Sequence, residues 1–187
     1  MYNFEKHISN RKTMTEYWLG NFNTVEVYMN QQGQFANEGE ILVTNGLNGC
    51  VALIVRAEMP DGKVKGFLAH KHLDKKRIHE FLNDLKNGNL LLDAKLYGTI
   101  LYPGNEHGLM LSLEAETIQE EIQQKLINNF APEAWYQLRS VRYAIYRGFP
   151  GSVNSNRLAY NISANMWVYR EGADLEHPLS GLLKHDK

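Results

Sequence analysis

The stretch EILVTNGLNGCVALIVRAEMPDGKVKGFLAH, residues 40–70, decides the fold. Its apolar and β-branched runs are bounded by glycine, asparagine and proline, a pattern typical of strands separated by turns. Because PDG at 60–62 is a strong turn signal, residues 50–58 and 63–70 are predicted to be the two arms of a hairpin. VALIV is apolar at successive positions, which favours a strand covered on both faces.

Strands and helices alternate outward from this hairpin. Apolar helical spacing predicts one amphipathic helix that starts at an N-cap on Asp74 and stops at Gly88, and a second helix over 114–130. Residues 31–39 are predicted to be a polar loop. The other predicted strands are 24–29, 40–44, 90–102, 135–148 and 158–170. This order predicts an α+β fold with mixed, mostly antiparallel β-sheets, sandwich-like, packed with two or more helices.

Length and composition favour one globular domain over residues 1–187, with a loosely ordered tail after about 172. The chain is 43% hydrophobic, which is enough to bury a core. Its net charge of −1 lacks the basic excess of a nucleic-acid-binding protein, and no apolar run approaches the roughly 20 residues that cross a bilayer. The N-terminus has no apolar signal segment, so we expect a cytoplasmic protein, or one exported without a cleaved signal peptide.

Cys50 is the only cysteine, and it follows the turn NGLNG directly. Gly46 and Gly49 allow positive φ angles and leave main-chain N–H groups open to a substrate. A turn of this kind suits a thiol that another molecule must reach. The alternative is a small buried hydrophobe, the commonest environment of a lone cysteine.

A nucleophilic thiol needs a base, because a free thiol with a pKa of about 8.5 is mostly protonated at neutral pH. Hairpin pairing of 50–58 with 63–70 brings the start of one strand beside the end of the other. It predicts that Cys50 lies close to His70, with His72 slightly beyond. A slip in register would favour His72 as the base.

Several short motifs are similar to those of the glutamine deamidase superfamily. That group includes the chemotaxis deamidase CheD, the catalytic domain of cytotoxic necrotizing factors and Burkholderia lethal factor. Thr44 lies six residues before Cys50, and Leu47-Asn48-Gly49-Cys50 resembles the toxin form of the motif. The segments GFLAH (66–70) and LLLDAKLYG (90–98) resemble the histidine motif and a later strand of CheD.

The resemblance implies hydrolysis of a protein glutamine side chain to glutamate. Cys50 would be the nucleophile, His70 the base and Thr44 the residue that orients His70. Gly49 and Asn48 would bind the substrate and its oxyanion. It implies a protein partner with an exposed glutamine, no nucleic acid, no membrane, no cofactor and no metal.

Alternatives remain open for both the substrate and the activity. A toxin-like or effector-like enzyme would act on a host protein, whereas an enzyme of the chemotaxis type would act on a chemoreceptor. A transglutaminase or another amidase could use the same cysteine and histidine. The last alternative is a catalytically inactive binding module of the same fold, in which Cys50 is buried and unreactive.

Overall fold

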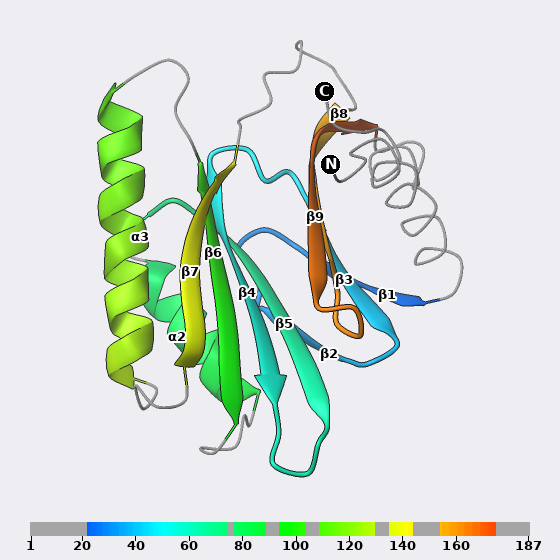
Figure 1. Ribbon diagram of the computed structural model, residues 1–187. Coiled ribbons are helices and arrows are strands. Elements are labelled where there is room, and N and C mark those ends of the chain that lie inside the picture. The colour runs from blue at the N-terminus through cyan, green and yellow to red at the C-terminus, as the bar shows by residue number, and fades with distance from the viewer. Residues whose placement is uncertain are drawn as a thin grey trace, which may run out of the picture.

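The computed structural model describes residues 22–74, 77–88, 94–103, 109–129, 135–143 and 154–174. In these ranges, two helices, a five-stranded sheet and a four-stranded sheet form three successive layers (Figure 1). Most neighbouring strands are antiparallel, and parallel pairs occur once in each sheet. The predicted α+β class with mixed, mostly antiparallel sheets is therefore confirmed.

The four-stranded sheet, called sheet A, carries Thr44. Its strands in spatial order are β1 (Asn23–Val27), β3 (Glu40–Asn45), β8 (Asn154–Asn161) and β9 (Met166–Asp174). β3 runs parallel to β1 and antiparallel to β8, so it has hydrogen-bonded neighbours on both sides. This central position holds Thr44 within a continuous ladder.

The five-stranded sheet, called sheet B, carries Cys50 and both histidines of interest. Its strands in spatial order are β2 (Gln34–Asn37), β5 (Val64–His72), β4 (Cys50–Glu58), β6 (Lys95–Pro103) and β7 (Trp135–Tyr143). The predicted hairpin of β4 and β5 is present, and it lies at the centre of this sheet. β6 and β7 are parallel, and the helix between them packs on the same sheet.

Both described helices cover the face of sheet B that points away from sheet A (Figure 1). They are α2 (Ile78–Asn87) and α3 (Leu109–Asn129). Their predicted apolar stripes are buried against the sheet at Phe81, Leu82, Leu85, Ile118, Ile122 and Leu126. Neither helix is long and apolar enough to span a bilayer.

β4 divides its side chains between two cores because successive strand residues point to opposite faces. Val51, Leu53 and Val55 pack under the helices. Cys50 and Ala52 pack between the two sheets, together with residues of β3, β5 and β8. The run VALIV is buried on both faces, which confirms the expectation for a covered strand. The single thiol thus lies in the layer between the sheets.

Five local expectations are wrong. Residues 34–37 of the predicted polar loop form β2, because pairing with β5 at the sheet edge outweighs their weak strand signal. Residues 162–165 turn within the predicted strand 158–170, which therefore splits into β8 and β9.

α2 starts later than predicted, with Arg77 rather than Asp74 at the N-cap. α3 starts earlier, at Leu109 instead of residue 114. Of the predicted loose tail, residues 172–174 belong to β9, and the rest lies outside the described residues.

Candidate active site

The turn before β4 is built as its glycines suggest. Gly46 and Gly49 have φ angles of 75° and 79°, which only glycine adopts at little cost. Between them Leu47 is fully buried and anchors the turn in the core between the sheets. The turn therefore fixes where β4 begins, and it places Cys50 at the first position of that strand.

The thiol itself is covered. Cys50 is only 2% exposed, so the expectation of an open thiol is not met in this conformation. Its Sγ atom lies 3.6 Å from Sδ of Met29 and 3.7 Å from Nδ1 of His72. Both of these neighbours are themselves exposed to solvent. A single layer of side chains thus separates the sulfur from water.

The hairpin register differs from the predicted one by two residues. Pairing is centred on Asp61 of the turn, so Cys50 is directly opposite His72, and Ala52 is opposite His70. The predicted closeness of Cys50 to His70 is corrected accordingly. His70 is the diagonal neighbour of Cys50 on the same face, at a separation that long side chains can bridge.

Thr44 meets His70 across the gap between the sheets. Its hydroxyl donates its only proton to the backbone oxygen of Val27 at 2.6 Å, and the same Oγ1 lies 2.8 Å from Nδ1 of His70. Nδ1 of His70 must therefore be the donor in the second bond, which leaves the lone pair on Nε2. That Nε2 is buried and has no hydrogen-bond partner among the described residues. The hydroxyl contact expected of Thr44 is present, and it selects a tautomer that can accept a proton.

Burial controls the charge state of the pair. Burial, as the largest cause, and the nearby His72 and Lys71 together lower the pKa of His70 from 6.5 to about 4. Burial also raises the pKa of the Cys50 thiol, and the backbone N–H of Asn48 offsets this in part. At neutral pH the site therefore rests as a thiol beside a neutral imidazole, and not as a thiolate–imidazolium pair.

Tyr143 of β7 occupies the backbone amide of Cys50, next to the residues expected to stabilise an oxyanion. Its buried hydroxyl accepts a hydrogen bond from the Cys50 N–H at 2.9 Å and donates one to the Cys50 carbonyl at 2.6 Å. Burial raises the pKa of this hydroxyl, and the backbones of Cys50 and Gly49 offset the rise in part. Of the two predicted oxyanion residues, Asn48 is exposed to solvent and Gly49 is partly buried.

Sequence reasoning missed both Tyr143 and Met29 as neighbours of Cys50. Met29 follows β1 in the connection to β2, and Tyr143 is 93 residues away in the chain. Neither stands in a motif, and nothing in the sequence singles out Tyr143 among ten tyrosines. Only the tertiary fold brings them to the thiol.

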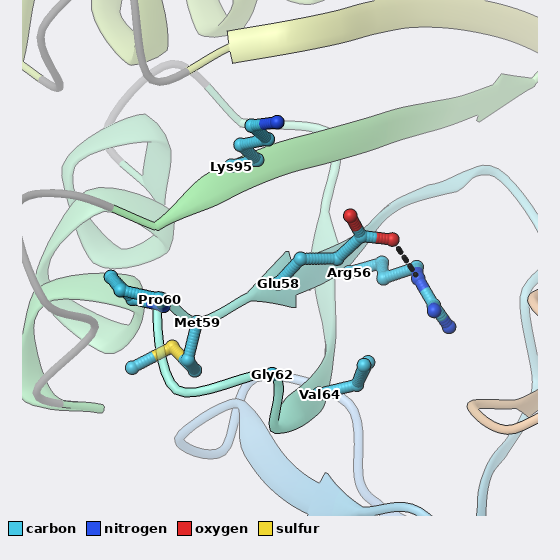
Figure 2. Close-up of a pocket in the computed structure, with 7 residues that line it drawn as sticks. All are labelled: Arg56, Glu58, Met59, Pro60, Gly62, Val64 and Lys95. Carbon is cyan, nitrogen blue, oxygen red and sulfur yellow. Dashed lines mark hydrogen bonds and ion pairs between the residues drawn. The ribbon is translucent and has the colours of Figure 1, made fainter.

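A surface pocket lies at the opposite end of β4 from Cys50 (Figure 2). Arg56 and Glu58 line it and form an ion pair with 3.1 Å between Nε and Oε1, while Lys95 projects from β6. Its lining contains neither a cysteine nor a histidine. Among the described residues, no three histidine, cysteine or acidic side chains are grouped so as to hold a metal ion.

Comparison with known proteins adds a distant structural likeness. No family model matches the sequence, and no curated protein matches it. A crystal structure of the Neisseria meningitidis protein NMB0706, of the family DUF152, is similar with a TM-score of 0.40 and 9% sequence identity. The likeness covers 74% of this chain and 70% of that chain. At this level it carries no argument about fold or function.

Proposed function

We propose that the protein is a cysteine-dependent amidohydrolase that converts a protein glutamine to glutamate. One observation carries the proposal: His70 donates a hydrogen bond from Nδ1 to Thr44, which fixes it as a neutral base with an unpartnered Nε2, on the sheet face that also presents Cys50. This is the order of roles in a nucleophile–base–orienter triad. The resemblance of residues 47–50 to the toxin motif leads us to expect a host protein as substrate.

The reaction uses the thiol and the base in two halves. Sγ of Cys50 attacks the amide carbon while Nε2 of His70 accepts the thiol proton. The carbon–nitrogen bond breaks, His70 returns the proton to the departing ammonia, and a thioester remains. Water then attacks the thioester with His70 as the base, and glutamate and the thiol are released.

The resting charge state makes proton transfer part of the attack. Because the raised pKa of Cys50 and the lowered pKa of His70 disfavour an ion pair, the thiol loses its proton only as the sulfur bonds to carbon. His72 contacts the sulfur directly and is the second candidate for the base. The exposed ring of His72 and the 3.7 Å between its Nδ1 and Sγ favour His72 as the base.

The burial of Cys50 favours a second function, a binding module without catalysis. A thiol that stays covered by Met29 in every state has no access to a glutamine. The two functions differ in one respect that can be measured, namely whether an amide in solution reaches the sulfur.

The deciding experiment measures glutamine hydrolysis with matched variants. A glutaminyl dipeptide with blocked ends and a eukaryotic cell extract are each incubated with the protein in water enriched in heavy oxygen. Mass spectrometry then locates glutamate that carries the isotope. We expect activity in the wild type, none in Cys50→Ser, and a loss of about 10²–10⁴-fold in His70→Ala. Equal activity in wild type and Cys50→Ser would refute the enzyme.

The same assay separates the alternatives. A large loss in His72→Ala with activity retained in His70→Ala assigns the base to His72. Incorporation of an added primary amine in place of water identifies a transglutaminase. Conversion of isolated chemoreceptors but of no protein in the eukaryotic extract identifies an enzyme of the chemotaxis type.

A further inference from the structure

The side chain of Met29 covers the thiol of Cys50. Its Sδ lies 3.6 Å from Sγ of Cys50, while 42% of the residue remains exposed. The contact is therefore made at the rim of the site, by a side chain that reaches inward from solvent. Its three rotatable side-chain bonds allow it to leave without a change in the backbone.

The backbone around Met29 is held in place. Asn30, which has a φ angle of 62°, donates its N–H to the carbonyl of His70 at 2.8 Å and accepts the N–H of His72 on its side-chain oxygen at 2.9 Å. The carbonyl of Gln31 accepts a hydrogen bond from Nζ of the buried Lys71. The turn is thus fastened to the strand that carries both histidines, and the mobile part of the cover is the methionine side chain.

Methionine and glutamine have the same unbranched stem. In both, Cβ and Cγ separate Cα from a δ atom, which is sulfur in methionine and the amide carbon in glutamine. A reacting carbon must come to about 3–3.5 Å from its nucleophile. The Sδ of Met29 stands near that distance from Sγ, at the position where the amide carbon of a bound glutamine would lie.

We infer that the side chain of Met29 occupies the place of the substrate's glutamine side chain when no substrate is bound. This inference rests on the proposed function. The substrate side chain displaces Met29 and takes over its path to Cys50. It must be unbranched, uncharged and long enough to bring its amide carbon to the δ position, which excludes asparagine. Because Met29 enters from an exposed turn, the matching substrate is a glutamine on a surface turn of a folded protein.

Replacement of the methionine by the residue that it imitates tests the inference. In Met29→Gln, Sγ of Cys50 attacks the introduced amide carbon, ammonia leaves with the thiol proton, and water cleaves the thioester. We expect the introduced glutamine to become glutamate within one molecule, independently of protein concentration. Peptide mapping by mass spectrometry reads the conversion, and the exposed Gln31 and Gln32 serve as internal controls.

Two matched variants define the background. Met29→Asn carries the same amide one carbon short of the sulfur, and we expect it to stay intact. Met29→Gln combined with Cys50→Ser keeps the glutamine and removes the thiol, so any remaining conversion is spontaneous. An introduced glutamine that stays intact in a protein that still hydrolyses the blocked dipeptide overturns the inference and leaves the proposed function standing.

Alkylation of Cys50 by iodoacetamide tests the cover without any need for hydrolysis. An open state populated to about 10% or less limits the wild-type rate, so Met29→Ala should react at least about tenfold faster at a pH where the thiol is ionised. Met29→Leu keeps a bulky cover and should react like the wild type. If Met29→Ala is no faster, the cover does not exist and the inference fails. If it is faster but neither dipeptide nor introduced glutamine reacts, the cover stands and the proposed function fails.

Discussion

One hydroxyl proton sets the chemistry available to His70. Thr44 gives that proton to Val27, so the imidazole must donate from Nδ1 and keep its lone pair on Nε2. In a fully buried ring, this choice also avoids charge, because burial disfavours the imidazolium. The same contact therefore fixes the orientation, the tautomer and the protonation state of a single side chain.

His70 couples stability to pH in a defined direction. Its folded pKa of about 4 lies below the ordinary 6.5, so the unfolded chain binds the proton first as the pH falls. The histidine costs nothing above pH 6.5, and its penalty grows to about 3 kcal/mol as the pH falls to 4. Urea unfolding across this window should show a steeper loss for wild type than for His70→Gln. His79→Gln changes an exposed ring in α2, on the other side of sheet B, and should follow the wild type; equal slopes for all three proteins would contradict the assignment.

Tyr143 supports the backbone of Cys50. Tyr143→Phe leaves the buried N–H and carbonyl of Cys50 without their partner, and each such group costs about 1–3 kcal/mol. We expect a clear loss in the free energy of unfolding, measured with denaturant at neutral pH. Tyr136→Phe removes a hydroxyl from the same strand at a residue that is 73% exposed, and it should be neutral. A similar effect in both variants would mean that the hydrogen bonds to Cys50 add nothing.

At the scale of elements, β5 serves two layers at once. His70 points toward sheet A, whereas its neighbour Lys71 points toward α2. Lys71 is 2% exposed, and its Nζ lies 2.8 Å from Oδ2 of Asp84 in that helix. The same carboxylate accepts the N–H of Gly33 ahead of β2. The pair therefore joins β5, α2 and the connection that carries Met29.

Asp84→Asn tests the charge of this pair. The amide oxygen keeps the bond from Gly33, but Lys71 loses its nearer counter-charge inside the protein. Removing one member of a buried pair costs about 3 kcal/mol or more, so the denaturation midpoint should drop sharply. Lys63→Ala removes a solvent-exposed pair with Asp61 and should leave the midpoint almost unchanged. Comparable losses would show that Lys71 is solvated without Asp84.

Local pattern predicted the elements better than it predicted their pairing. Apolar spacing and the PDG turn placed β4, β5 and both helices. The register of the hairpin depends on where pairing is centred, and an error of one position in that centre moves the partner of Cys50 by two residues. β2 has only Phe35 and Ala36 as apolar residues, so its strand state comes from β5 and not from its own sequence.

At the scale of the whole molecule, the two sheets approach closely at Gly66. A Cβ built on this residue of β5 would lie 2.2 Å from Cγ1 of Ile162, which comes from the turn after β8. Because Gly66 has no side chain, Ile162 can pack directly on β5. It does so on the face of β5 that also carries Leu68 and His70. The spacing between the sheets in turn sets the reach from Thr44 to His70.

Gly66→Ala should destabilise the protein by forcing the sheets or Ile162 to shift. Overpacking of this kind costs about 1–3 kcal/mol, measured as a change in the free energy of unfolding. Lys65→Ala alters the adjacent residue of the same strand, which is only partly buried, and should have a small effect. If both variants match the wild type, the sheets are not held at contact distance here.

The site combines residues that the sequence could and could not suggest. Spacing and resemblance selected Thr44, Cys50 and His70, and the structure brings the first and third into contact. Met29 and Tyr143 required the tertiary structure, because no local pattern marks a residue that becomes a neighbour only when distant strands pack. The sequence left open whether Cys50 is exposed or buried, and the packing of these distant residues decides for the buried state.

The split of Thr44 and His70 between two sheets also fixes when the site can form during synthesis. Once β5 has left the ribosome, the nascent chain already holds Thr44, Cys50 and His70. Sheet A still lacks β8, which begins at Asn154 and flanks β3 on its second side. β3 therefore gains its second neighbour only after residue 154 has been synthesised, so the layer that holds Thr44 opposite His70 is completed late in translation.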